Sequence, residues 1–310
     1  MNYEINELIV LCVVRNGETY IKSFVEHYFS LGVKHIVFLD NGSTDNTIAI
    51  ASKYSNVSIL QTHCPYQKYE TLMKRYLVKR FSKNRWNLFA DIDELFDYPF
   101  SNILNLRELL TYLNKNSYTA VVAQMLDMFS NGSSFQDLIV NKNNSLKELN
   151  KYYDISNISK ISYSWGLLSN TSIKMHWGGI RKTLFDTNNG LTKAPMIFIN
   201  NKIKPFVDFH HVKNASIADF SCVLLHYPFA CPFQEKVYEA VQTNRYQESA
   251  SDEYRMYWNK LMQVPDLIIN QKTAHELKSV NDLINGFLIV SEKYKKWVKL
   301  HEIKNTNTII

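Results

Sequence analysis

Residues 87–95 read NLFADIDEL, an apolar run that ends in a cluster of carboxylates. The run predicts a buried strand, and alternate residues of an extended segment share a face, so Asp91 and Asp93 are expected to point the same way. Carboxylates at the carboxyl end of a central strand lie where open α/β sheets bind ligands, and they suit a hard cation such as Mg²⁺ or Mn²⁺. The alternative is a helix cap or a solvated turn, and the tripeptide alone is too common to decide.

Strand-like and helical segments alternate on both sides of this stretch. Apolar runs predict strands at 8–14, 35–39, 57–60, 87–90 and 119–126. Helical spacing of apolar residues predicts helices at 18–31, 66–81 and 106–113. The alternation implies βαβ units, so the predicted fold class is α/β, with a Rossmann-like, mostly parallel central sheet flanked by helices.

Composition bounds the class of protein. The chain has 310 residues, of which 45% are hydrophobic, and we expect a main domain at 1–230 followed by a helical extension at 231–310. The net charge of +6 is too dispersed to predict nucleic-acid binding. The four cysteines, Cys12, Cys64, Cys222 and Cys231, show no CxxC spacing, which favours a reduced compartment. With no secretion signal and no apolar run long enough to span a bilayer, the prediction is a cytoplasmic protein.

Two segments outside the alternating pattern have distinct compositions. Residues 131–160 are rich in Asn, Ser and Lys and predict a loop or insertion beside the site. Residues 292–304 read EKYKKWVKLHEIK, with five lysines among apolar side chains. This segment is either a basic amphipathic helix in peripheral contact with the cytoplasmic face of the inner membrane, or an ordinary solvated terminal helix.

Acidic residues end three of the predicted strands, at Asp40, Asp91 and Asp127. If these strands are parallel, their carboxyl ends open on one edge of the sheet, where a nucleotide would bind. Asp40 can accept hydrogen bonds from a base or a ribose, or it stabilises the Asn-Gly turn that follows. In that turn, Ser43 or Thr44 is expected to cap the next helix.

Several of these segments resemble one known family. Residues 13–16 (VVRN), 31–33 (LGV) and 38–47 (FLDNGSTDNT) resemble the start of family-two-like glycosyltransferases with the GT-A fold, and residues 87–95 look like the Asp-x-Asp segment of that family. The segments 126–129 (LDMF), 178–182 (GGIRK) and 224–227 (LLHY) are similar to a bacterial branch of it. The resemblance covers most of residues 8–260.

The resemblance implies a metal-dependent sugar transferase. Its donor would be a nucleotide-diphosphate sugar, a UDP-sugar by family habit, and its acceptor a hydroxyl of a glycan or glycolipid in bacterial surface polysaccharide or lipooligosaccharide synthesis. Mn²⁺ or Mg²⁺ would stabilise the charge that grows on the leaving diphosphate. Asp93 would ligate the metal, Asp91 would contact the ribose or the metal through water, and His226 would complete the metal site. The alternative for His226 is a core histidine at a strand end.

The acceptor hydroxyl needs a base, which in the inverting members that this chain resembles is a carboxylate after the metal motif. Asp127 is the first candidate by position, with Glu94 and Asp154 as rivals, and Asp127 is alternatively a simple cap. A single displacement by such a base would invert the anomeric centre, unlike the double displacement of a retaining carboxylate pair.

The candidate nucleotide contacts come from five segments, and they are Arg15, Asn16, Asp40, Asn41, Lys68, Asp91, Arg181 and Lys182. The family places such contacts after the first strand, but many relatives have Asn-Glu where this chain has Asn16-Gly17-Glu18, which leaves the role of that carboxylate open. Arg181 and Lys182 follow two glycines that permit close backbone approach, so they either bind a diphosphate or anionic acceptor or lie in a solvated turn. Lys68 belongs to a basic helix that either reaches the nucleotide or lies on the surface.

Large aromatic residues are a further feature with two interpretations. Trp165, Trp177 and Tyr227 either stack on an acceptor sugar or serve as packing residues.

Two other functions remain open from the sequence. A nucleotidyltransferase would share a similar sheet, but it needs a glycine-rich basic phosphate loop near the first strand, of which residues 15–17 are a poor version. A catalytically dead carbohydrate-binding protein is the non-enzymatic alternative.

Overall fold

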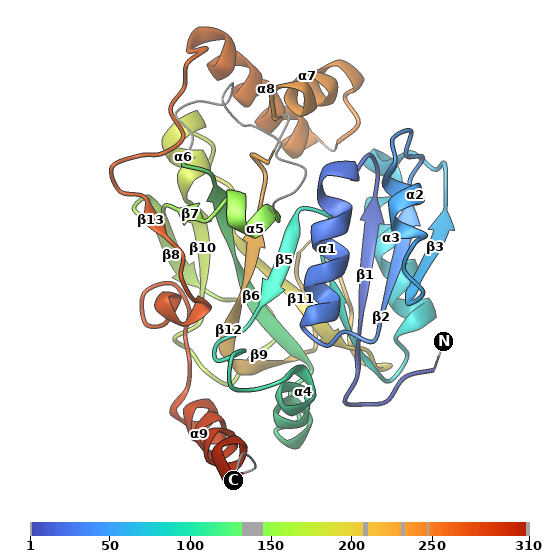
Figure 1. Cartoon of the computed structure of the whole chain (residues 1–310), viewed down its shortest axis with the longest axis vertical. Helices are drawn as coiled ribbons and strands as arrows, with labels where there is room; N and C mark the ends of the chain where they lie inside the picture. The colour runs from blue at the N-terminus through green and yellow to red at the C-terminus, as the bar shows by residue number, and fades with distance from the viewer. Residues whose placement is uncertain (1, 132–144, 207–209, 231–232, 247, 308–310) are drawn as a thin grey trace.

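The computed structural model describes residues 2–131, 145–206, 210–230, 233–246 and 248–307. Residues 132–144 of the predicted loop at 131–160, and also Cys231, therefore lie outside the described residues. The rest of that segment is not a loop throughout, because it contains short elements at 146–149, 152–153 and 158–162. Figure 1 shows a twisted central sheet with helices packed along it.

Four parallel strands form the first half of the sheet. These are β1 (Leu8–Val14), β2 (His35–Asp40), β3 (Val57–Gln61) and β4 (Trp86–Phe89), in the spatial order β3-β2-β1-β4. The connecting helices are α1 (Glu18–Ser30), α2 (Thr47–Ala51) and α3 (Tyr66–Phe81). This is the order of one half of a doubly wound fold, in which ligands bind where the strand order reverses, here between β1 and β4.

Strand β1 is apolar throughout because both of its faces are covered. Val10 and Cys12 belong to the hydrophobic cluster on one face of the sheet, whereas Ile9 and Leu11 belong to the cluster on the other. All four side chains are fully buried. A continuous apolar run is the expected pattern for a strand that is covered on both faces.

The second half of the sheet is mixed. β11 (Thr192–Phe198) runs antiparallel between β4 and β6 (Ala120–Phe129), so β6 points the same way as β4. β12 (Ser216–His226) lies parallel to β6, and β5 (Glu94–Asp97) pairs antiparallel with β12. The predicted α/β fold, with a mostly parallel central sheet flanked by helices, is confirmed. The predicted end of the fifth strand at Leu126 is wrong, because β6 continues past Asp127.

The remaining elements surround this sheet, and they are α4 (Leu106–Lys115), α5 (Leu146–Leu149), β7 (Tyr152–Tyr153), β8 (Ile158–Ser162), β9 (Leu167–Leu168), β10 (Lys174–Gly178), α6 (Ile180–Phe185), α7 (Phe233–Thr243), α8 (Glu248–Gln263), β13 (His275–Glu276), the 3₁₀ helix η1 (Val280–Leu283) and α9 (Glu292–Asn307). Helices α7 and α8 lie at the end of the molecule toward which β1 points, whereas α4 and α9 lie at the opposite end (Figure 1). The division of the chain at residue 230 stays a prediction.

Helix α9 is the lysine-rich segment at 292–304, and most of its apolar side chains pack inside the protein. Tyr294 is fully buried, with its ring stacked on Phe220 at a centroid distance of 4.1 Å, and Val298 is buried beside it. Leu300 and Ile303 remain exposed, at 57% and 52%. Burying an aromatic ring of this size contributes roughly 1.5–3 kcal/mol, so this face of the helix belongs to the core.

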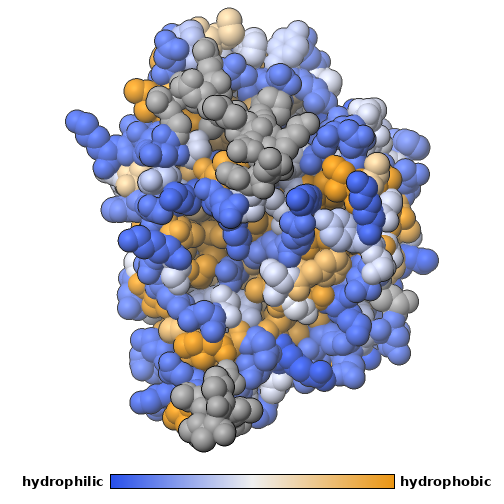
Figure 2. Space-filling view, in the orientation of Figure 1, coloured by the Kyte–Doolittle hydropathy of each residue, from blue (hydrophilic) through white to orange (hydrophobic). Residues whose placement is uncertain are grey.

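Membrane contact of α9 stays a prediction. On the face drawn in Figure 2, hydrophobic residues show in separate groups between hydrophilic ones rather than as one band. Within the described part of the chain, no helix has the length and apolar character that crossing a membrane requires.

Candidate active site

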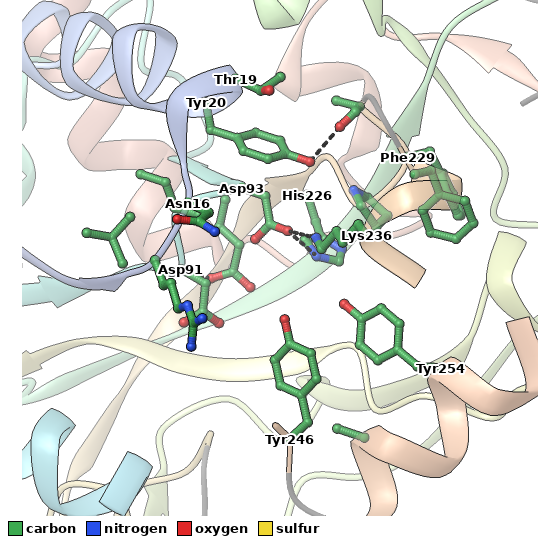
Figure 3. A pocket seen from close by; sticks show the side chains of 18 of the residues that line it. Asn16, Thr19, Tyr20, Asp91, Asp93, His226, Phe229, Lys236, Tyr246 and Tyr254 are labelled. Atoms are coloured by element: carbon green, nitrogen blue, oxygen red, sulfur yellow. Dashed lines mark hydrogen bonds and ion pairs between the residues drawn. The ribbon is translucent and has the colours of Figure 1, made fainter. Parts of the chain in front are cut away.

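A cleft of about 2570 Å³ opens at the carboxyl ends of the parallel strands. It lies between the strand ends, α1 and the α7–α8 pair, and Figure 3 shows side chains converging into it from these elements. The predicted site residues that line it are Arg15, Asn16, Asn41, Asp91, Asp93, Glu94, Arg181 and His226. The cleft lining does not include Asp40, Lys68, Asp127, Asp154 or Lys182.

The acidic motif forms a turn rather than an extended segment. β4 ends at Phe89, and the Glu94 amide donates to the Asp91 carbonyl oxygen at 2.9 Å. The expectation that Asp91 and Asp93 share a strand face is therefore wrong. The turn instead directs the two carboxylates toward different cations.

Asp91 and Glu94 share the ammonium group of Lys193. This Nζ lies 2.8 Å from Asp91 Oδ2 and 2.5 Å from Glu94 Oε1. Burial raises the pKa of Asp91, but the ammonium groups of Lys193 and Lys74 outweigh it and hold this pKa well below its usual range. Burial, aided by Asp91, raises the pKa of Glu94 despite Lys193. The three groups form an ionic cluster in the floor of the cleft, in which Glu94 and Lys193 are buried and Asp91 is partly exposed.

Asp93 has different partners, Lys236 and His226. Its Oδ2 lies 3.1 Å from Lys236 Nζ on α7 and 3.8 Å from His226 Nε2 (Figure 3). Burial raises the pKa of Asp93, but Lys236 and His226 outweigh it and lower this pKa below its ordinary value. Asp93 is thus an ionised carboxylate at the cleft, 13% exposed, between an ammonium and an imidazole.

Strand register sets the orientation of His226. In β12, His226 pairs with Asp127 of β6 on one side and with Glu94 of β5 on the other. Its Nδ1 lies 2.6 Å from Asp127 Oδ1. Because an ionised carboxylate only accepts, we assign the ring proton to Nδ1, which leaves the Nε2 lone pair directed to the side of Asp93.

Asp127 is held on both oxygens. Its Oδ2 accepts from Arg181 Nε at 2.8 Å, and Arg181 Nη1 in turn lies 3.1 Å from Glu253 Oε1 on α8. Tyr257 donates to the same Glu253 carboxylate. Burial raises the pKa of Asp127, but Arg181 and His226 outweigh it and lower this pKa. Asp127 is therefore placed to orient His226, and Arg181 links β6 to α8.

The loop after β1 is tied to the turn after β2. The amides of Asn16 and Gly17 donate to the hydroxyls of Ser43 at 3.0 Å and Thr47 at 2.7 Å. The predicted cap by Ser43 or Thr44 is wrong, since α2 has Asn46 as its N-cap without a side-chain bond.

Gly17 allows this loop to approach the acidic motif. A β-carbon at Gly17 would lie 2.9 Å from Ile92 Cγ1, the residue between Asp91 and Asp93. The adjacent Glu18 carboxylate accepts from the amide and side chain of Asn46, in the neighbouring turn. The glycine between Asn16 and Glu18 thus serves packing, and Glu18 ties α1 to the start of α2.

Asp40 and Asn41 support the local turn. Asp40 is 2% exposed, and its Oδ1 accepts from the Ser43 amide at 3.0 Å. Asn41 Nδ2 donates to the carbonyl oxygens of Thr62 and Cys64. Nucleotide contact by Asp40 or Asn41 stays a prediction, as it does for Arg15, which is exposed at the cleft.

The Gly-Gly segment brings its two cations to different places. Gly178 has a φ of 96°, and a β-carbon there would lie 2.5 Å from the Asn157 carbonyl oxygen, so the close approach is to the protein's own backbone. Arg181 reaches the cleft and Asp127, whereas Lys182 pairs with Asp186 on its own helix.

The two other residues outside the cleft lining have local partners. Lys68 lies over the ring of Tyr69, with 5.3 Å from its Nζ to the ring centroid. Asp154, the rival base, accepts from the Ser156 amide and the Thr273 hydroxyl.

A pair of tyrosines, which the sequence did not single out, forms an aromatic wall of the cleft. Tyr246 and Tyr254 stack with centroids 5.0 Å apart and an interplanar angle of 7° (Figure 3). Tyr66 meets Tyr246 edge-on at 6.5 Å. Of the aromatic residues predicted to stack on a sugar, Trp177 lines the cleft, whereas Tyr227 is 1% exposed and packs in the core.

Sequence reasoning missed the cations that balance the acidic motif. Lys193 stands in a strand that is otherwise apolar around it, TKAPMIF, and a lysine in such a run is a signal for a buried ion pair. Lys236 and Glu253 carry no comparable signal, because each reads as an ordinary charge on an amphipathic helix.

The described residues fit a divalent cation in part. Within the described ranges, no three His, Cys, Asp or Glu side chains already stand in a metal-binding arrangement. Asp93 Oδ2 and His226 Nε2 face each other at 3.8 Å, whereas adjacent ligands of an ion with bonds of about 2.1 Å are roughly 3 Å apart. Metal-binding histidines typically donate their other ring N–H to a carboxylate, as His226 does to Asp127. A small side-chain shift would therefore let Asp93 and His226 hold one ion.

Comparisons with known proteins add a fold-level likeness only. Neither a protein-family model nor the sequence of a curated protein matches this chain. Among solved structures, it is similar to S. aureus TarS (20% identity over 42% of this chain and 24% of that one, TM-score 0.31). It is also similar to glucosyl-3-phosphoglycerate synthase from Mycobacterium tuberculosis in complex with Mn²⁺, UDP and glucosyl-3-phosphoglycerate (17% over 38% of this chain and 43% of that one, TM-score 0.27).

A third similar structure is HddC from Yersinia pseudotuberculosis (7% identity over 77% of this chain and 99% of that one, TM-score 0.33). The matched region spans less than half the length of TarS and of glucosyl-3-phosphoglycerate synthase. TM-scores this low do not establish a shared function.

Proposed function

We propose that this chain is a metal-dependent glycosyltransferase that moves a sugar from a nucleotide-diphosphate sugar, expected to be a UDP-sugar, to a hydroxyl of a glycan or glycolipid. The observation that carries the proposal is the row formed by Asp93, His226 and Asp127 at the edge of the cleft. A carboxylate faces an imidazole nitrogen, and a second, buried carboxylate orients the imidazole. This arrangement suits a divalent cation whose other ligands are phosphate oxygens.

In this proposal Asp93 and His226 would hold Mn²⁺ or Mg²⁺, and the bound ion would supply Lewis-acid stabilisation of the charge on the diphosphate. Asp127 fixes the ring of His226, so that Nε2 stays directed at the metal position. Lys193 offsets one of the two negative charges of Asp91 and Glu94, which lessens the repulsion between the floor of the cleft and an anionic donor. The stacked tyrosines offer a flat surface for a base or a sugar ring.

The choice of base follows from which carboxylates reach the cleft. Both oxygens of each carboxylate have partners, which are Arg181 and His226 for Asp127, and Lys193 and the Asp91 amide for Glu94. Glu94 lines the cleft and has a raised pKa, whereas Asp127 does not line it. A base works best when its pKa lies near the operating pH. We therefore assign removal of the acceptor proton to Glu94, with a single inverting displacement, and the orienting role to Asp127.

The loop after β1 favours this function over a nucleotidyltransferase. A phosphate-cradling loop needs backbone N–H groups that point at the ligand. Here the amides of Asn16 and Gly17 bind hydroxyls of the next turn, and the Glu18 amide donates to Asp45 Oδ2 at 3.0 Å. These three donors are therefore occupied by the protein itself.

A screen of sugar nucleotides with Mn²⁺ tests the proposed function, with release of the nucleotide diphosphate as the readout. We expect release with at least one donor, and loss of release when the metal is chelated. Thermal stabilisation by nucleoside triphosphates but not by UDP with Mn²⁺ would favour a nucleotidyltransferase. A sugar nucleotide that binds but is never turned over would favour a binding protein.

A further inference from the structure

Two lysines reach the acidic motif, and they are held in different ways. Lys193 bridges two carboxylates, and its side chain is 10% exposed. Lys236 contacts one carboxylate, Asp93, at the longer distance of 3.1 Å, and its side chain is 31% exposed. Lys193 is thus a fixed part of the floor, whereas Lys236 has solvent on one side and fewer bonds to break.

Lys236 lies next to the proposed metal position, because it contacts the same carboxylate oxygen. Its ammonium group and the Nε2 of His226 both approach Oδ2 of Asp93, at 3.1 and 3.8 Å. An ion bound to Asp93 and His226 would lie beside the same oxygen, and two cations cannot share that position without strong repulsion. Repulsion by a divalent ion bound between Asp93 and His226 would therefore favour movement of Lys236 away from this oxygen.

The stem of Lys236 permits such a movement. The side chain starts from α7 and lines the cleft, with its Nζ 5.8 Å from the centroid of the Tyr20 ring. A lysine carries three donors on a flexible four-carbon stem and binds phosphate as a point charge. Phosphate oxygens that share an ion with Asp93 would lie next to it and offer a new partner.

We propose that Lys236 is an exchangeable cation of this site: it neutralises Asp93 while the cleft is empty, and it transfers to the diphosphate when a divalent ion takes Asp93. The inference rests on the proposed function, because it takes from it the ion and the diphosphate. It makes metal and diphosphate binding cooperative, since the ion alone must break the Lys236–Asp93 pair without compensation. The diphosphate then supplies the displaced ammonium with a partner.

The test compares Mn²⁺ affinity in the wild type and in Lys236→Met, measured from free Mn²⁺ by electron paramagnetic resonance. Mn²⁺ alone should bind at least about tenfold more tightly to the variant, because a nearby positive charge is removed. The second quantity is the dissociation constant of Mn²⁺ alone divided by that of the Mn²⁺–pyrophosphate complex. This ratio should fall about tenfold in the variant, because the ammonium–phosphate contact is lost.

Two further variants separate this role from a general charge effect. Lys22→Met removes the same charge from another lysine that lines the cleft, and both quantities should change less than about twofold. Lys236→Arg keeps a cation and should retain weak binding of Mn²⁺ alone. A thermal unfolding scan confirms that each variant is folded.

Unchanged or weaker binding of Mn²⁺ alone to Lys236→Met would overturn the inference. An unchanged ratio of the two dissociation constants would overturn it as well. So would a complete lack of Mn²⁺ binding in every variant. These constants do not depend on turnover. A failed screen of sugar nucleotides would count against the proposed function without altering them. Conversely, normal transfer together with unchanged Mn²⁺ affinity would overturn the inference alone.

Discussion

The carboxylates at the cleft and the carboxylate of Asp219, at the end of the sheet near α4, differ in the kind of partner that they have. Asp219 accepts from the hydroxyls of Tyr112 on α4, at 2.9 and 3.0 Å, and of Ser291 just before α9, at 2.5 Å. Asp93 at the cleft is matched instead with an ammonium and an imidazole. Hydroxyl donors satisfy a carboxylate while joining packed elements, whereas a partly exposed cation can be exchanged for a ligand.

The largest expected effect comes from Asp93→Ala. We expect metal-dependent release of nucleotide diphosphate to fall by at least about 1000-fold, because a metal ligand at the leaving group is lost. The melting temperature should change by only a few degrees, since Lys236 can be solvated. Turnover at the wild-type rate in this variant would show that Asp93 does not hold the metal. The contrast between Asp93 and Asp219 would then no longer stand.

The second effect concerns the orienting carboxylate. Asp127→Asn should lower the affinity for Mn²⁺ by about 10–100-fold, as is typical when the hydrogen-bond partner of a metal-binding histidine is removed. Titration of free Mn²⁺ measures this. Asp154→Asn is the matched control, because Asp154 is equally buried but bonds to Ser156 and Thr273 away from the cleft. Equal losses in the two variants would contradict an orienting role for Asp127.

The third effect is the opposite of the first, because it lowers stability and leaves metal binding unchanged. Asp219→Ala should reduce the free energy of unfolding by about 2 kcal/mol, because the hydroxyls of Tyr112 and Ser291 lose their acceptor. Mn²⁺ affinity should stay within about twofold of the wild type. Urea unfolding monitored by fluorescence measures the stability, and the Mn²⁺ titration measures the metal affinity. A loss of metal affinity as large as that of Asp93→Ala would show that the two ends are coupled.

The smallest effect is a pH dependence at His27, a buried imidazole whose Nε2 lies 2.7 Å from the Phe96 carbonyl oxygen. Burial, with Lys147 nearby, lowers the pKa of His27 from 6.5 to about 3. Between these values the unfolded chain binds more protons, so this stability is complete above about pH 6.5 and is lost as the pH falls toward 3. His27→Gln should make the fall in unfolding free energy shallower by roughly 1 kcal/mol per pH unit.

Urea unfolding between pH 6.5 and 4.5 measures this slope. The cleft carboxylates, including Glu94 with its raised pKa, titrate alike in the wild type and the variant, so the difference between the two slopes reports His27. Identical slopes in the wild type and the variant would show that His27 is not held neutral in the fold.

The sequence predicted the fold better than the geometry of the site. The apolar runs at 8–14 and 35–39 match β1 and β2 closely, because a strand buried on both faces must be apolar throughout. The helix at 66–81 matches α3 at both ends. The acidic motif was found but given the wrong local shape, because a turn closed by one backbone hydrogen bond leaves no periodic pattern.

What the sequence determined by itself is the α/β sheet and the acidic residues at its carboxyl edge, since both follow from local patterns of apolar and charged residues. What only the tertiary structure decided is which cation each carboxylate meets. The register of β12 against β6 brings His226 to Asp127, and the packing of α7 over the cleft brings Lys236 to Asp93. These contacts join residues about 100 positions or more apart, and such pairings depend on how packed elements fit together, which local spacing does not encode.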